Sequence, residues 1–279
     1  MSDTIKILSE KARFVRRNTL EMIVAANKGH IGGAFSCIDI LTILYYAPFL
    51  RFDVTNARWF ERDRFILSKG HCCEALYVIL ADLGFISKSE LGCYQKGGGI
   101  LAGHPDRRVP GIEADTGSLG HGLGIACGMA LRAKLDGLPF FTLALLGDGE
   151  CCEGSVWEAA LFAAHRGLGH LIGIVDANGV CSTDILADCS SVEPLTAKWR
   201  AFGWDVIEVD GHNIVDLLTI FESLKARDMN NRPLMIIART VKGKGVSFME
   251  GSPSWHHGVP KGAQLDGARQ ELGETLLIV

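Results

Sequence analysis

The sequence has little net charge and no long apolar run. Its 28 Lys and Arg residues nearly balance 32 Asp and Glu, which leaves a net charge of −4 and excludes the basic surfaces typical of nucleic-acid or anionic-membrane binding. The most apolar run, residues 40–50, is too short to cross a bilayer and is interrupted by Thr42 and Pro48. Residues 1–17 carry several charges and no signal-peptide hydrophobic block. We therefore expect a soluble cytoplasmic protein with no nucleic-acid or membrane partner.

The signatures of several common site types are also missing. None of the nine cysteines forms a Cys-x-x-Cys pair, and adjacent cysteines such as Cys151-Cys152 are spaced unsuitably for disulfides or zinc sites. We expect reduced, buried thiols that act as small apolar fillers. No Walker motif occurs, and a dinucleotide-binding Gly-x-Gly-x-x-Gly fails at Ile125 and at Cys127. Dehydrogenase and nucleoside triphosphatase functions are thereby disfavoured.

Helical and strand patterns alternate along the sequence. Apolar positions at helical spacing predict helices over residues 5–27, 38–46, 74–83, 122–135, 154–166, 196–202 and 214–227. Short apolar runs predict strands over 64–67, 140–146, 205–209 and 234–240, and a further strand leading into Val175. This order predicts an α/β fold with a mostly parallel sheet and helices on both faces. Without a repeat or a polar linker, residues 1–279 are expected to form one domain.

Two neighbouring strand ends carry oxygen ligands. Gly-Asp-Gly-Glu at 147–150 follows one apolar run, and Asn178 follows the next, 30 residues after Asp148. Parallel strands joined by a helix bring both segments to the same edge of the sheet. Because Mg²⁺ prefers near-octahedral oxygen ligands, the Asp148 carboxylate, the Asn178 side-chain carbonyl and the Val180 backbone carbonyl are candidate metal ligands. The alternative is that residues 147–150 form only a surface turn.

These segments resemble a known family. Gly-Asp-Gly followed about 30 residues later by Asn resembles the diphosphate motif of thiamine diphosphate enzymes, and GDGECCEGSVWEAALFAAHRGLGHLIGIVDANG is similar to transketolases. The resemblance extends from Arg13 to about Gly273 but covers only the diphosphate-binding domain. It implies thiamine diphosphate and Mg²⁺ as cofactors. Asp148, Gly149 and Asn178 would then hold the diphosphate together with the metal, since glycine lets the backbone come close to it.

Four histidines lie in glycine-bearing loops, and each alone is typical of a surface or capping residue. Together, His30, His71, His104 and His257 match loops that line the cofactor and sugar channel of transketolases. The resemblance implies that His71 lies against the diphosphate and thiazolium, and that His257 touches both sugar and diphosphate. It implies that His30 contacts the sugar and that His104 lies near the reacting carbonyl. We expect His30, His104 and His257 to be catalytic, because neutral imidazole polarises carbonyls and relays protons.

The remaining site assignments follow from the same resemblance. The backbone of Gly117, Ser118 and Leu119 is expected to face the aminopyrimidine ring of the cofactor. His121 stands where many relatives carry glutamine, so a polar contact and a catalytic role are both open. We assign to structure the histidines without motif support, His165, His170, His212 and His256. Lys242-Gly243-Lys244 is interpreted as a solvated turn.

Whole transketolases continue with a pyrimidine-binding domain that supplies a catalytic glutamate, and no such segment follows Val279. The resemblance therefore implies the N-terminal subunit of a split, two-chain transketolase. A separate pyrimidine-binding subunit would complete it, in a heterotetramer of two plus two closed around a twofold axis. The complex would transfer a two-carbon ketol unit from a ketose phosphate to an aldose, as in the pentose phosphate pathway.

Three alternatives stay open. The first is another thiamine-dependent transferase, similar to deoxyxylulose phosphate synthase or acting in a specialised sugar pathway. Residues 196–204 and 209–212 resemble transketolases more closely than that synthase. The second is a non-catalytic regulatory subunit, which the intact Asp148 and Asn178 disfavour. The third is a chain cut from a longer protein.

Overall fold

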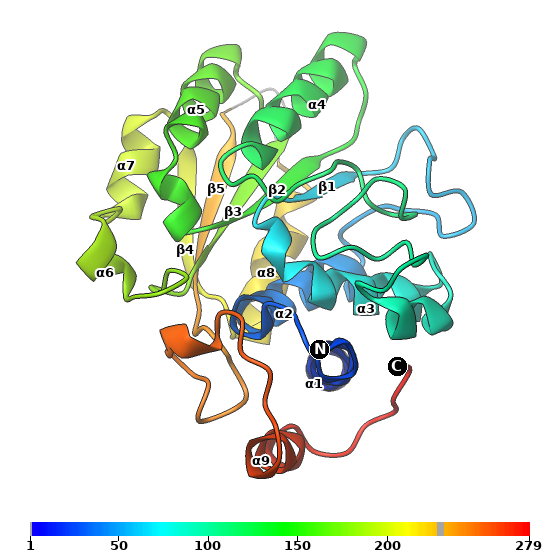
Figure 1. The fold of residues 1–279 in the computed structure, drawn as a ribbon. Coiled ribbons are helices and arrows are strands. Elements are labelled where there is room, and N and C mark those ends of the chain that lie inside the picture. The colour runs from blue at the N-terminus through cyan, green and yellow to red at the C-terminus, as the bar shows by residue number, and fades with distance from the viewer. Residues whose placement is uncertain (1, 228–231) are drawn as a thin grey trace.

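The structure is a computed structural model that describes residues 2–227 and 232–279. Its centre is a parallel sheet with the strand order β1-β2-β3-β5-β4. The strands are β1 (Arg64–Leu67), β2 (Thr142–Gly147), β3 (Leu171–Ala177), β4 (Asp205–Asp210) and β5 (Leu234–Arg239). Helices lie on both faces of this sheet (Figure 1), so the predicted fold class is confirmed.

The helices form two layers with separate apolar cores. One layer contains α4 (Gly122–Asp136), α5 (Gly154–Arg166) and α7 (Leu195–Ala201), and the other contains α1 (Ser2–Ala26), α2 (Ile31–Tyr46), α3 (Cys73–Leu83) and α8 (Ile214–Leu224). Successive strand residues alternate between the cores: Leu143 and Leu145 pack with the α2 layer, and Ala144 and Leu146 with the α4 layer. A strand buried on both faces reads as a continuous apolar run, which is why the sequence shows no alternation there.

The largest difference from the predicted elements is the start of α2. The helix begins at Ile31 and not at residue 38, and its residues 31–45 are all buried. Gly32 and Gly33, which resemble helix breakers in sequence, serve close packing here. A Cβ at Gly32 would lie 2.8 Å from the Trp255 carbonyl oxygen, and one at Gly33 2.8 Å from Cys72 Sγ.

Other boundaries differ by less, and several short elements were not predicted. Helix α8 ends at Leu224 and not at residue 227, where turns follow. The unpredicted elements are α6 (Leu186–Cys189), α9 (Ala263–Leu272) and the 3-10 turns η1 (Gly70–Cys72), η2 (Lys88–Cys93), η3 (Gly149–Cys152) and η4 (Pro253–Trp255). Helix α9 buries only Ala268 and Leu272, so its apolar pattern is weak. Within the described residues, no helix has the length and apolar character to cross a membrane.

Candidate active site

The carboxyl ends of β1, β2 and β3 open into a cavity of about 330 Å³. Loops that directly follow these strands supply Lys69, His71, Asp148 and Asn178 to its lining. The sheet therefore brings together the two strand ends that the sequence singled out. The complete lining is Gly33, Lys69, His71, Gly117, Leu119, Gly147, Asp148, Gly149, Glu150, Asn178, Val180, Cys181, Ser182, Lys242 and His256.

Asp148 presents a carboxylate that has been removed from water. The residue is 4 % exposed, its Oδ1 accepts from the Gly149 N–H at 2.8 Å, and its Oδ2 accepts from the Gly179 N–H at 2.6 Å. Burial raises the pKa of Asp148 to about 6, and the Asp176 carboxylate adds to this shift. A buried carboxylate whose charged form is disfavoured gains from a cation placed beside it.

The other two predicted metal ligands lie on the facing loop. The Asn178 Oδ1 accepts from the Val180 N–H at 3.1 Å, and the Val180 carbonyl oxygen lies 3.4 Å from the Lys242 Nζ. Asp148 and Asn178 are joined through Gly179, whose N–H donates to the Asp148 carboxylate. Asp148, Asn178 and Val180 thus all line the same cavity.

Lys242 was predicted to lie in a solvated turn, and this interpretation is wrong. The side chain is 2 % exposed and donates to the Cys181 carbonyl and, at 3.0 Å, to the His256 Nδ1. Burial, together with the Lys69 ammonium, lowers the pKa of Lys242 to about 8. A cation therefore lies in the wall of the cavity, where it can meet an anion. Its Lys-Gly-Lys context is typical of exposed turns; the signal that could have found it is its position directly after the predicted strand 234–240, at the carboxyl edge of the sheet.

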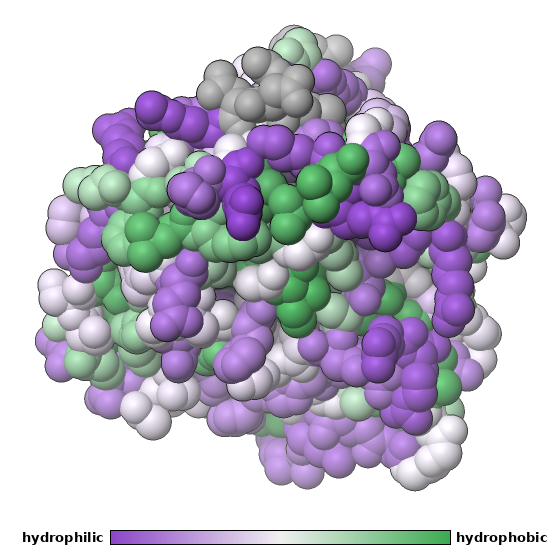
Figure 2. Space-filling model, turned by 90° about the horizontal axis from the view of Figure 1, so that it is seen from above, coloured by the Kyte–Doolittle hydropathy of each residue, from purple (hydrophilic) through white to green (hydrophobic). Residues whose placement is uncertain are grey.

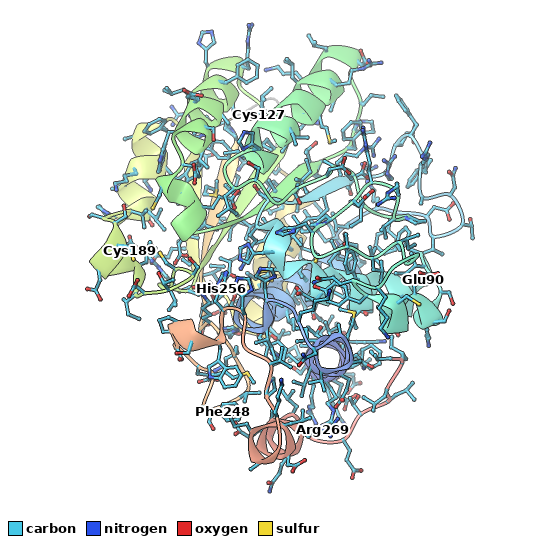
Figure 3. The ribbon with its side chains drawn as sticks, in the orientation of Figure 1. Glu90, Cys127, Cys189, Phe248, His256 and Arg269 are labelled. Atoms are coloured by element: carbon cyan, nitrogen blue, oxygen red, sulfur yellow. The ribbon has the colours of Figure 1, made fainter. Side chains whose placement is uncertain are left out.

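His256 was assigned to structure, but it also lines the cavity. Figure 3 shows it near the centre of the molecule, beside α2. Burial and the Lys242 ammonium lower the pKa of His256 to about 3. The signal that could have found it is its position directly before His257, in a segment that the resemblance already assigned to the site.

Beneath the cavity, two buried acids hold the loops. Asp176 pairs with Lys69 and also accepts from Ser36 and Thr240. Burial alone would raise the pKa of Asp176, but the Lys69 ammonium and the hydrogen bonds from Lys69, Ser36 and Thr240 together outweigh it and hold this pKa below its usual range. Glu150 accepts from Ser68 and from backbone N–H groups of residues 120 and 147. These bonds tie the ends of β1, β2, β3 and β5 together.

The four predicted loop histidines converge with His256. The ring centroid of His30 lies 4.2 Å from that of His257, 5.4 Å from that of His71 and 5.8 Å from that of His104. Burial, followed by neighbouring cations and imidazoles, lowers the pKa of His71, His104 and His257. These three imidazoles are therefore neutral near pH 7 and are able to donate or to accept.

The loop before α4 is shaped by Gly117. Its φ is +138°, and a Cβ there would lie 2.7 Å from the His104 ring, so glycine is required by conformation and by space. Gly117 and Leu119 line the cavity, whereas Ser118 is not part of its lining. His121 is exposed, and its Nδ1 lies 3.0 Å from the Leu119 carbonyl oxygen, so this loop contact is the polar alternative left open above.

Two of the histidines assigned to structure, His165 and His170, lie outside the cavity lining. His165 lies on α5 and is not part of the cavity, and the buried His170 contacts the Phe140 carbonyl through Nδ1. All nine cysteines are free thiols. Cys151 is buried as expected, but Cys93, Cys152 and Cys189 are exposed, so they do not fill the core.

Comparison with known proteins agrees with this geometry. The profile of the transketolase thiamine diphosphate binding domain matches residues 7–275. One subunit of the apulose-4-phosphate transketolase of Phocaeicola vulgatus is 42% identical over 274 residues, which are 98% of this chain and 95% of that protein. The 6-deoxy-6-sulfo-D-fructose transketolase subunit SqwG of Clostridium sp. is 42% identical over 92% of this chain and 93% of that protein.

Solved structures agree with these relatives. Transketolase from Campylobacter jejuni matches 96% of this chain with a TM-score of 0.90 at 29% identity, and transketolase from Leishmania mexicana matches 95% with a TM-score of 0.87 at 28% identity. The chain spans about two fifths of the length of these proteins, 43% and 41%. By profile, by sequence and by fold, this chain belongs to the transketolase family, in which it corresponds to the thiamine diphosphate-binding domain.

Proposed function

We propose that this chain is the diphosphate-binding subunit of a two-chain transketolase that depends on thiamine diphosphate and Mg²⁺. The complex would move a two-carbon ketol unit from a ketose phosphate to an aldose. The observation that carries the proposal is the cavity that Asp148 and Asn178 line together with Lys242, His71 and His256.

The donor set fits both cofactors. Asp148, Asn178 and the Val180 carbonyl offer the oxygen ligands that Mg²⁺ prefers, and the raised pKa of Asp148, about 6, marks a carboxylate in need of a cation. At Gly147 and Gly149, a Cβ would meet no atom closer than 4.0 and 3.7 Å, so their missing side chains leave open space in the cavity. The diphosphate would lie against Gly149 and Asn178, near His71 and His257. When bound, thiamine diphosphate supplies a stabilised carbon nucleophile.

The chain's own residues would then handle the sugar. His30, His104 and His257 are not part of the cavity lining, but the His30 ring contacts those of the lining residues His71 and His256. Neutral imidazoles there can orient hydroxyl groups and exchange protons with them. The backbone of Gly117, Ser118 and Leu119 would face the pyrimidine side of the cofactor.

The proposal includes a separate pyrimidine-binding subunit. Relatives of the same length are themselves named as transketolase subunits. The α4 and α5 layer also exposes the apolar side chains of Leu135, Leu161 and Phe162. Seen from above, the surface carries hydrophobic side chains among hydrophilic ones (Figure 2). Exposed apolar side chains gathered on one face are typical of an interface. We propose a heterotetramer of two plus two subunits, in which this chain contributes a single domain. We also propose that the complex lies in the cytoplasm, because nine free thiols suit a reducing compartment.

A specialised sugar pathway is a second candidate, because the two relatives that are 42% identical are named for apulose 4-phosphate and 6-deoxy-6-sulfofructose. Donor assays with the reconstituted pair separate the candidates. Xylulose 5-phosphate turnover supports the pentose phosphate pathway, turnover of the unusual ketoses supports the specialised one, and pyruvate turnover contradicts both.

The cofactor assignment is tested by calorimetric titration of thiamine diphosphate into the reconstituted pair, with and without Mg²⁺. We expect metal-dependent binding that Asp148→Ala abolishes. Asp184→Ala is the matched control, because Asp184 is an exposed acid of the next loop and does not line the cavity. Unchanged affinity in Asp148→Ala would refute the metal site, and no binding by the wild-type pair would support a regulatory subunit.

A further inference from the structure

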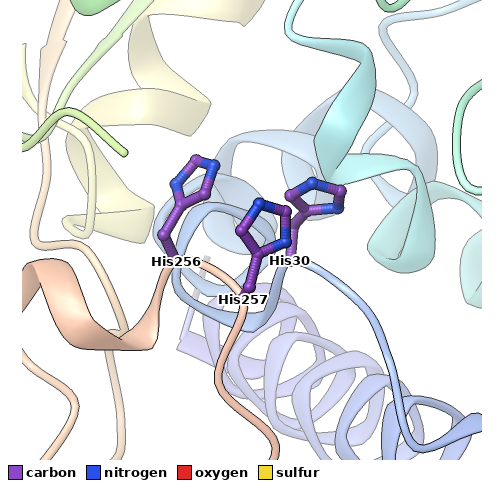
Figure 4. A group of neighbouring side chains, drawn as sticks. All are labelled: His30, His256 and His257. Carbon is purple, nitrogen blue, oxygen red and sulfur yellow. The ribbon is translucent and has the colours of Figure 1, made fainter. Parts of the chain in front are cut away.

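Three imidazoles at the mouth of the cavity form a compact cluster. One ring nitrogen from each of His30, His256 and His257 lies within 4.8 Å of the other two. His30 directly precedes α2, whereas His256 and His257 follow η4, so the cluster joins two segments that are distant in sequence. Figure 4 shows the three rings side by side, projecting in one direction from these segments.

The ligand chemistry of this cluster differs from that of the oxygen site around Asp148. Imidazole nitrogen suits zinc and neighbouring transition metals, whereas Mg²⁺ prefers oxygen. Three histidine ligands with one open position are a recurrent zinc arrangement, with Zn–N distances of about 2 Å. Closing the cluster around an ion needs shifts of roughly 1 Å on that geometry, and His257 is exposed and free to make them.

A carboxylate supports the cluster from behind. Glu74 is fully buried, and its Oε1 accepts from the His30 N–H at 2.8 Å and lies 3.7 Å from the His30 Nδ1. The His30 Nδ1 and the Glu74 Oε2 have no hydrogen-bond partner among the described residues. Metal-binding histidines commonly direct their second nitrogen at such a carboxylate, and the negative charge favours a cation in the cluster.

One charge opposes the cation. Lys242 donates to the His256 Nδ1 at 3.0 Å, which leaves the Nε2 of His256 as the ligand atom. The site therefore combines an attractive buried carboxylate at His30 with a repulsive ammonium at His256, and we expect reversible binding.

We propose that His30, His256 and His257 bind one Zn²⁺ or a similar transition-metal ion at the mouth of the cavity. A consequence of this site rests on the proposed function. The ion occupies imidazoles that we assign to the sugar, so it inhibits ketol transfer by competing with the ketose. Thiamine diphosphate and Mg²⁺ bind deeper, through Asp148 and Asn178, and do not compete with it.

Binding is tested on the full chain without an affinity tag, with Co²⁺ as the spectroscopic probe and Zn²⁺ added to displace it. We expect one Co²⁺ per chain with visible ligand-field bands and without a thiolate charge-transfer band. His257→Ala should weaken binding by about tenfold or more. His165→Ala is the matched control, because it removes an imidazole on α5, outside the cluster, and should leave the affinity unchanged.

Three results would overturn the site: no stoichiometric binding, equal affinity in His257→Ala, or a thiolate band that assigns the ion to cysteine. The thiamine titration keeps this test separate from the proposed function. Cobalt binding without cofactor binding would remove the proposed function and leave the metal site. Cofactor binding and ketol transfer that Zn²⁺ does not inhibit would remove only the inhibitory role.

Discussion

At the scale of single residues, the candidate site is built from charges that the fold has removed from water. Asp148, Glu150, Asp176, Lys69 and Lys242 are each less than 5 % exposed. Asp176 and Lys69 neutralise each other, and Glu150 is held by three donors. Asp148 has only backbone donors, and Lys242 only neutral acceptors. Asp148 and Lys242 thus face the cavity without an opposite charge in contact.

The cost of the buried Asp148 charge predicts how stability depends on pH. Its pKa is raised from 3.8 to about 6 on folding, so the folded state disfavours ionisation. Well below pH 4 the carboxyl is protonated in both the folded and the unfolded state and does not affect stability. As the pH rises from about 4 to above 6, the free energy of unfolding falls by up to about 3 kcal/mol. Asp148→Ala removes this loss.

We therefore expect the free energy of unfolding of Asp148→Ala, minus that of the wild type, to rise between pH 4 and pH 7 in metal-free buffer. Urea denaturation at several pH values measures this difference. The corresponding difference between Asp184→Ala and the wild type should not change with pH. Mg²⁺ with inorganic pyrophosphate should stabilise the wild type and Asp184→Ala but not Asp148→Ala. A flat difference for Asp148→Ala would contradict the buried-charge argument.

Which site residues the sequence could reveal depends on their local context. Asp148 and Asn178 follow apolar runs, so parallel pairing of β2 and β3 brings them together. His256 follows no strand, and Lys242 follows the apolar run 234–240, but its Lys-Gly-Lys context resembles an exposed turn. Lys242 reaches the cavity because the segment after β5 returns across α2, where the Gly243 N–H donates to the Gly32 carbonyl. A contact between residues so far apart in the sequence leaves no periodic pattern.

At the scale of elements, the same segment is held by a buried polar chain. The His212 Nδ1–H donates to Asp39 at 2.7 Å, and the His212 Nε2 accepts from the Val241 N–H at 2.8 Å. Arg16 pairs with the same Asp39 carboxylate. These bonds fix the tautomer of His212 and link α1 and α2 to the residue before Lys242.

His212 is therefore expected to position Lys242. His212→Leu leaves a buried N–H and part of a carboxylate unpaired, which costs about 1–3 kcal/mol, and we expect weaker binding of inorganic pyrophosphate in the presence of Mg²⁺. His212→Gln can donate to Asp39 and accept from Val241, so it should restore affinity. Calorimetry measures both variants; wild-type affinity in His212→Leu would show that Lys242 is held without this chain.

The elements themselves were predictable where burial left a pattern. Residues 64–67 and 154–166 agree with β1 and α5 at both ends. The start of α2 was missed because a fully buried helix has no polar face and because Gly32 and Gly33 resemble breakers. Their role depends on Trp255 and Cys72, which only the folded chain brings close.

At the scale of the whole molecule, the two helix layers differ in what they leave exposed. In the α2 layer, the helices expose large apolar side chains singly, Ile7 on α1 at 58 % and Val215 on α8 at 41 %, and the segment after α9 exposes Leu276, Leu277 and Val279. In the α4 and α5 layer, Leu161 and Phe162 stand next to each other at 58 % and 38 % exposure. Their helix begins at Gly154, shortly after Asp148, and both side chains lie about two turns along it, toward the end away from the cofactor loop.

This contrast predicts which face the partner subunit covers. We expect the double variant Leu161→Glu/Phe162→Glu to fold normally, because neither side chain is in the core, but to lose assembly with the pyrimidine-binding subunit, since burying two carboxylates at an interface is unfavourable. Sedimentation velocity of the mixed chains measures this, and Ile7→Glu, an exposed apolar site on the opposite layer, is the matched control. Assembly that survives the double variant and fails in Ile7→Glu would place the partner on the α1 side. Loss in neither would mean that the partner docks through another surface, such as the loop before α4, where His121 is exposed.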